Sequence, residues 1–148
     1  HARHGFAERP FAALVIGLTR DRADLYRRIE VRIEEQLARG LVDETRRLLD
    51  LGYGRELGSM KGLGYRQIAG YLAGDYSYED AVRQLKRDTR RFAKRQLTWF
   101  RKEAAIAWVS VGQDESADEV ASRIRPSVQQ FVGRLGWAGA TGRPAVTA

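Results

Sequence analysis

Only two stretches of this sequence have the composition of β-strands. Residues 11–18 (FAALVIGL) form a short, continuous apolar run, which is typical of a strand buried on both faces of a parallel sheet. Residues 105–111 (AIAWVSV) are the second candidate. Two strands make a poor sheet by themselves. Either the fold is mostly helical, or further strands lie in sequence outside these 148 residues.

Helical signals dominate the rest of the chain. A helix is predicted to begin near Asp21, with Thr19 or Asp21 as its cap, and to end or bend at Gly40. Its apolar stripe recurs every four residues: Leu25, Ile29, Ile33 and Leu37. Further helices are predicted over residues 41–51, 65–72, 78–104 and 116–132.

Local signals refine these helices and the chain ends. Ser77 and Asp80 match a capping box for the long helix over residues 78–104. Pro126 is expected to interrupt or kink the last helix. Residues 1–10 are expected to form a loop, and the Gly/Ala-rich residues 136–148 a disordered end.

Several classes of protein are excluded by composition. The chain has no cysteine, and its two histidines, His1 and His4, stand at the extreme end, so no zinc site, Ser-His-Asp triad or cysteine nucleophile is expected. The run over residues 11–18 is too short to span a membrane and lacks the layout of a signal peptide. Because the chain does not begin with Met, we expect it to be a processed, excised or incomplete piece of a longer protein.

Positive charge is concentrated in one segment. The net charge is +7, and residues 79–102 hold nine basic residues against three acidic ones, Glu79, Asp80 and Asp88. With so few acids to compensate, this segment is predicted to contact a phosphate backbone, although a solvated helix face is the plainer alternative. Phe92 and Trp99 lie seven apart on the apolar stripe and are expected in the core. The basic residues are Arg83, Lys86, Arg87, Arg90, Arg91, Lys94, Arg95, Arg101 and Lys102.

Two smaller motifs also suggest anion binding. In residues 60–67 (MKGLGYRQ), Gly62 and Gly64 allow a ligand to approach the backbone where a helix begins, although an ordinary glycine-rich turn has the same pattern. Arg28 and Arg32 flank the stripe of the first helix and can reach a phosphate. Their spacing fits a surface ion pair with Asp24 or Glu35 better.

Taken together, three segments resemble the C-terminal part of the tRNA dimethylallyltransferase family. They are DRADLYRRIEVRIEEQLARGLVDE, MKGLGYRQIAGYLAG and KRDTRRFAKRQLTWFRK, in this order, and the resemblance covers roughly residues 11–111. It implies the last part of a P-loop-like α/β core with helices that contact tRNA, followed by a tail over residues 112–148. No glycine-rich loop ending in Lys-Ser/Thr is present in the chain.

The resemblance implies a cytoplasmic, monomeric enzyme. Such an enzyme transfers the dimethylallyl group of dimethylallyl diphosphate to the exocyclic amine of the adenosine beside the anticodon, with Mg²⁺ and release of diphosphate. The phosphate-binding loop and the general-base aspartate belong to the family's N-terminal part, so this chain alone is expected to be nearly inactive. The Mg²⁺ ligands are likewise expected outside this chain, and no membrane partner is expected.

Residue by residue, the resemblance assigns one catalytic and two tRNA-contacting positions. Arg28 matches an arginine near the diphosphate, where it would stabilise charge on the leaving group. The first tRNA-contacting segment is Lys61, Gly62, Leu63, Gly64, Tyr65 and Arg66. The second is Lys94, Arg95, Gln96, Leu97, Thr98, Trp99, Phe100 and Arg101.

Charge and spacing by themselves support only nucleic-acid binding in general. A stand-alone basic helical RNA-binding module without catalysis therefore stays open. So does a purely structural helical scaffold whose charge is incidental.

Overall fold

The structure is a computed structural model that describes residues 12–136, and the chain forms two compact units. One unit is Asp21–Glu103 and is entirely helical apart from its loops. The other combines the stretches on either side, of which residues 12–20 and 104–136 are described. The boundary expected between residues 111 and 112 lies inside this second unit.

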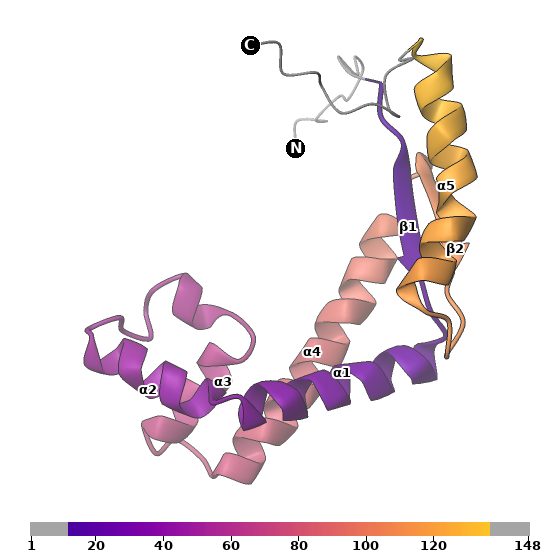
Figure 1. The fold of residues 1–148 in the computed structure, drawn as a ribbon. Helices are drawn as coiled ribbons and strands as arrows, with labels where there is room; N and C mark the ends of the chain where they lie inside the picture. The colour runs from indigo at the N-terminus through magenta and orange to yellow at the C-terminus, as the bar shows by residue number, and fades with distance from the viewer. Residues whose placement is uncertain (1–11, 137–148) are drawn as a thin grey trace, which may run out of the picture. The chain divides into compact units, whose positions relative to one another are not determined.

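Four α-helices build the helical unit. They are α1 (Arg22–Ala38), α2 (Leu41–Asp50), α3 (Tyr65–Leu72) and α4 (Tyr78–Phe100), with a short 3₁₀ turn, η1 (Ser59–Lys61), before α3. Helix α4 contacts both α1 and α3, and α3 contacts α2 (Figure 1). Their apolar faces form one core of buried side chains: Ile33, Met60, Ile68, Ala69, Ala81 and Leu85.

Side-chain caps and glycines set the ends of these helices. Asp21 caps α1, because its Oδ1 accepts the backbone N–H of Ala23 at 2.8 Å. Gly40, at φ +96°, separates α1 from α2. Ser77 caps α4, as predicted, by accepting the N–H of Asp80 at 3.1 Å. The predicted capping box is only half formed, because the Asp80 carboxylate accepts from the Ser77 hydroxyl at 3.1 Å and not from the Ser77 backbone N–H. The bounds predicted for α3 are confirmed, whereas α4 ends at Phe100, four residues before the predicted end.

The second unit holds a two-stranded parallel sheet. Strand β1 (Val15–Thr19) pairs with β2 (Ile106–Ser110), with Val15 opposite Ile106 and Thr19 opposite Ser110. Two strands in a mostly helical chain were predicted, and this is confirmed. Gly17 allows the close approach of the second strand's side chains, because a Cβ there would lie 2.6 Å from Ile106 Cγ2 and 2.7 Å from the Trp108 ring.

Two expectations about the first strand are wrong. The strand begins at Val15, so residues 12–14 of the predicted stretch are not part of it, and residue 11 lies outside the described residues. It is not buried on both faces either, since Leu18 is 54% exposed. In the described part of this unit only β2 pairs with β1, and a sheet of two strands leaves much of its apolar surface uncovered.

Helix α5 (Ala117–Arg134) follows the sheet. Ser116 and Glu119 form a capping box at its start, and Arg123 Nη1 donates to the Glu115 carboxylate at 2.6 Å and to the carbonyl of Ser110 at 3.0 Å. The helix runs through Pro126, so an interruption there is wrong, and the alternative expectation of a kink stays a prediction. The segments expected to be a terminal loop and a disordered end fall almost wholly outside the described residues. No helix within residues 12–136 is long and apolar enough to cross a membrane.

Candidate nucleic-acid interface

A groove of about 610 Å³ lies in the helical unit between the start of α3 and the middle of α4. Hereafter "the groove" means this site. One wall comes from η1, the turn after it and α3, and the other from four residues of α4 that share one helix face at steps of three and four. The lining residues are Lys61, Gly62, Leu63, Arg66, Asp88, Arg91, Phe92 and Arg95.

The glycine segment is fixed against α4 by one buried side chain. Gly64 has φ +98°, a conformation that a residue with a side chain rarely adopts, and its N–H donates to Gln67 Oε1 at 3.1 Å. Gln67 is only 1% exposed and donates through Nε2 to Asp88 Oδ2 at 3.1 Å. The amide of Gln67 therefore links the two walls of the groove.

Asp88 is the single carboxylate in the groove, and it is held by several donors. Arg87 Nε donates to its Oδ1 at 2.9 Å, and Arg66 Nη2 donates to its Oδ2 at 3.0 Å. The Arg87 hydrogen bond, followed by the Gln67 hydrogen bond and the charges of Arg87 and Arg66, lowers the pKa of Asp88 below its ordinary value. Asp88 is thus ionised at neutral pH and neutralises part of the positive charge around it.

Three cations of the groove have no carboxylate partner within residues 12–136: Lys61, Arg91 and Arg95. Arg95 lies over the ring of Phe92, with its Cζ 6.0 Å from the ring centroid. Cations at this density without acids repel one another, and an anion between them removes that repulsion. The groove is therefore chemically suited to phosphate groups.

Other cations of α4 are already paired, so the expectation of few compensating acids is wrong for them. Lys86 Nζ lies 2.8 Å from Glu34 Oε1, and Arg90 Nη1 lies 2.5 Å from Glu30 Oε1, which ties α4 to α1. Arg83 pairs with Asp80 one turn before it. Partners 52 and 60 residues away could not be assigned from the sequence.

The chain resembles known proteins over most of its length. Residues 1–103 match the family model described as IPP transferase. The chain belongs to this family. It is 51% identical over 120 residues to tRNA dimethylallyltransferase 2 of Syntrophus aciditrophicus. The matched residues make up 81% of this chain and 39% of that relative. The chain is 48% identical over 109 residues to the tRNA dimethylallyltransferase of Natranaerobius thermophilus, covering 74% and 33% of the two chains.

A solved structure of another IPP transferase has the same fold. The full-length tRNA isopentenylpyrophosphate transferase of Bacillus halodurans matches with a TM-score of 0.77 and 36% identity, over 83% of this chain and 40% of that chain. The expected fold class, the last part of the family's α/β core with its helices, is confirmed. This chain spans about two fifths or less of the relatives it matches.

The first predicted tRNA-contacting segment lies around the groove. Lys61, Gly62, Leu63 and Arg66 line it. Gly64 and Tyr65 instead line a smaller hollow of about 320 Å³ beside α2. There Tyr65 Oη donates to Glu44 Oε1 at 2.5 Å, and this hydrogen bond raises the pKa of Tyr65.

The second predicted segment contributes only Arg95 to the groove. Lys94, Gln96 and Arg101 are exposed, Leu97 is half-buried, and Thr98 Oγ1 donates to the carbonyl of Lys94 at 2.9 Å. Trp99 and Phe100 stack edge to face with their ring centroids 4.8 Å apart. Trp99 is 66% exposed and Phe92 44%, so the expectation that both lie in the core is wrong. Helical periodicity placed them on one face, but the packing around α4 leaves both rings largely exposed.

Arg28 lies on α1 and does not line the groove. Its Nε donates to the two carboxylate oxygens of Asp24 at 3.1 and 3.3 Å, and Arg27 Nη2 donates to the same carboxylate at 2.8 Å. Asp24 is buried, so the two arginines neutralise a carboxylate that has lost most of its water. The ion pair that the spacing favoured is thus present, and a role of Arg28 toward diphosphate stays a prediction.

The two predicted tRNA-contacting segments omitted Asp88, Arg91 and Phe92, which line the groove, and Gln67, which links its walls. Arg91 was predicted only as one of the basic residues of the phosphate-contacting helix segment. A signal for three of these four residues exists, because Asp88, Arg91, Phe92 and Arg95 follow the i, i+3, i+4, i+7 spacing of one helix face. Gln67 gives no such signal, since its partners are fixed only by the packing of α3 on α4.

Proposed function

We propose that this chain is the C-terminal part of a tRNA dimethylallyltransferase and that its groove binds the anticodon arm of tRNA in the cytoplasm. The whole enzyme would transfer the dimethylallyl group from dimethylallyl diphosphate to the exocyclic amine of the adenosine beside the anticodon. A new carbon–nitrogen bond forms as the bond to diphosphate breaks. Membership of the family and the names of its relatives support this chemistry.

The observation that carries the proposal is the composition of the groove. It brings Lys61 and Arg66 from one segment together with Arg91 and Arg95 from another, around a site of about 610 Å³. Three of these cations have no carboxylate to neutralise them in residues 12–136. Phosphates of a folded RNA are polyanionic partners of the right chemistry for such a surface.

The remaining chemistry is assigned to residues outside this chain. Residues 12–136 hold no cluster of three or more side chains that could bind a metal ion. We propose that the enzyme uses Mg²⁺ and that the ligands of this ion lie outside this chain. Arg28, whose Nε donates to Asp24, would stabilise the charge on the leaving diphosphate. We propose a single copy of the chain per active site.

The test is a chimeric enzyme. The matching C-terminal part of the Syntrophus aciditrophicus relative is replaced by this chain, and transfer of labelled dimethylallyl groups to tRNA is measured. The chimera is expected to modify tRNA, and this chain alone to show almost no transfer. Replacement of Lys61, Arg91 and Arg95 by Ala in the chimera should raise KM for tRNA while leaving KM for dimethylallyl diphosphate unchanged.

Two results would contradict the proposal. The first is a folded chimera that binds dimethylallyl diphosphate but neither binds nor modifies tRNA. The second is equal affinity of this chain for tRNA and for an unrelated RNA hairpin, which would favour the general RNA-binding module. Binding curves for both RNAs at two salt concentrations separate these cases.

A further inference from the structure

Phe92 is an exposed aromatic side chain among cations. It lies on the face of α4 that lines the groove, is 44% exposed, and has Arg91 beside it and Arg95 one turn further along the same face. Leu63 on the opposite wall is also exposed. An apolar ring left in water costs free energy in proportion to its exposed area. A solvated cationic face gives no reason for a ring in this position.

The Phe92 ring stays 44% exposed although Arg95 lies over it. The Cζ atom of Arg95 is 6.0 Å from the ring centroid, which is the outer limit of a favourable cation–π contact. Arg91 and Lys61 have no carboxylate partner within residues 12–136 and are held by no ion pair. The groove therefore offers an apolar ring face and several unneutralised cations to one ligand.

Only some ligands use both features. A phosphate group alone satisfies the cations but gains nothing from the negative face of an aromatic ring. A nucleotide carries a phosphate and a flat base on the same unit, and RNA-binding proteins stack unpaired bases on aromatic rings and on arginine planes. The volume of about 610 Å³ lies within the range of small-ligand sites, so a nucleotide fits.

We propose that the groove binds an unstacked nucleotide of single-stranded RNA, with its base on the Phe92 ring and its phosphate among Lys61, Arg66, Arg91 and Arg95. This inference rests on the proposed function, and it names a loop rather than a paired stem as the part of the RNA that enters the groove. Base-paired RNA keeps its bases stacked on their neighbours, so a duplex contacts the cations but not the ring. Phe92 acts as a positioning residue for the bound strand.

The experiment uses the full 148-residue chain and two RNA probes. One is a single-stranded heptanucleotide with 2-aminopurine at its centre, and the other is the same strand annealed to its complement. Stacking on the ring is expected to quench the fluorescence of the single-stranded probe. Phe92→Ala should weaken single-strand binding about 5- to 150-fold, the equivalent of ~1–3 kcal/mol per stacked base, and leave duplex binding and the salt dependence unchanged.

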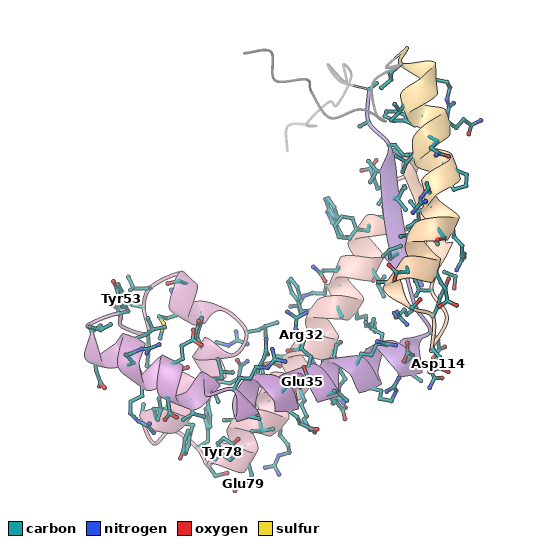
Figure 2. All side chains as sticks on the ribbon, viewed as in Figure 1. Arg32, Glu35, Tyr53, Tyr78, Glu79 and Asp114 are labelled. Carbon is teal, nitrogen blue, oxygen red and sulfur yellow. The ribbon has the colours of Figure 1, made fainter. Side chains whose placement is uncertain are left out.

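Three further variants make the test specific to the ring. Phe92→Leu keeps an apolar side chain without an aromatic face and should stay weakened, whereas Phe92→Tyr should restore the affinity and the quenching. Tyr53→Ala is the matched control, because Tyr53 is an aromatic residue of the same unit that is 50% exposed but does not line the groove (Figure 2). Thermal unfolding checks that each variant is folded.

The outcomes separate this inference from the proposed function. If the unmodified chain binds single-stranded RNA and Phe92→Leu binds it equally well, the stacking role is wrong while RNA binding stands. If Phe92→Ala weakens duplex and single strand equally, the residue supports the shape of the groove and the inference is also wrong. If the unmodified chain binds neither probe and no tRNA, both proposals are wrong.

Discussion

The two long faces of α4 carry the same kinds of side chain with opposite surroundings. On one face Arg83, Lys86 and Arg90 are each paired with a carboxylate, and two of these pairs join α4 to α1. On the groove face Arg91 and Arg95 have no such partner in residues 12–136. The comparison shows that the number of cations in a helix does not say how many are available for a ligand.

The difference follows from where the acids lie. Glu30 and Glu34 are one turn apart on α1 and meet the face of α4 that packs against that helix. The groove face meets a glycine segment instead, and its one acid, Asp88, is shared among Gln67, Arg66 and Arg87. Two of the cations on the first face hold α4 to α1. Those on the second can neutralise phosphates of a nucleic acid, which then releases its condensed counterions.

The largest predicted effect comes from removing two cations of the groove. The control variant removes the same net charge elsewhere in the helical unit. Arg91→Ala with Arg95→Ala should lower the salt-dependence slope of tRNA binding by about 1.4–1.8, because each phosphate contact contributes ~0.7–0.9. Arg46→Ala with Arg83→Ala removes the same charge from two exposed ion pairs and should change the slope by much less. Equal loss of slope in the two double variants would show that net charge, not the groove, determines binding.

A smaller effect is predicted for the glycine segment. Gly64 has φ +98° and ψ −74°, a backbone conformation that L-residues rarely adopt, so Gly64→Ala should lower the free energy of unfolding by about 1–3 kcal/mol. Gly58→Ala is the matched control, because Gly58 has φ −56° and nothing lies within 4 Å of a Cβ there. It should be neutral or stabilise by ~0.4–1 kcal/mol. Urea unfolding of both variants measures the difference. Equal stability of the two variants would show that the backbone at position 64 does not require glycine.

Sequence reasoning recovered what depends on neighbours along the chain. The caps Asp21 and Ser77, the bounds of α3 and the presence of two strands follow from local spacing and residue type. The two basic segments were also identified, but as separate motifs. Their meeting in one groove depends on how α3 packs on α4, which no local signal determines.

The errors have the same origin. Helical periodicity correctly puts Phe92 and Trp99 on one stripe, yet periodicity does not say what covers the stripe, and both side chains are exposed. Likewise the partners of Lys86 and Arg90 lie 52 and 60 residues away in sequence. Ion pairs within one helix turn, such as Arg28 with Asp24, could be expected from spacing, whereas pairs between helices could not.

The smallest predicted effect tests whether Asp88 competes with phosphate. Asp88→Asn removes the one negative charge of the groove and releases Arg66, so the salt-dependence slope of tRNA binding should rise by up to about 0.9 and the affinity should rise with it. Asp43→Asn, which removes the partner of the exposed Arg46 away from the groove, is the control and should leave tRNA binding unchanged.

Asp88→Asn should lower the stability of the fold while it raises the affinity for tRNA. The pKa of Asp88 is lower in the folded chain than its ordinary value of 3.8, chiefly because of the Arg87 hydrogen bond, so its charge stabilises the fold above that pH. This contribution is lost as the pH falls through the lower, folded-state pKa. Asp88→Asn should therefore be less stable than the unmodified chain at neutral pH and lose less stability on acidification, as urea unfolding at several pH values would measure. If the affinity for tRNA and the stability instead fall together, Asp88 maintains the shape of the groove through its hydrogen bond with Gln67. In that case Asp88 does not compete with RNA phosphates for Arg66.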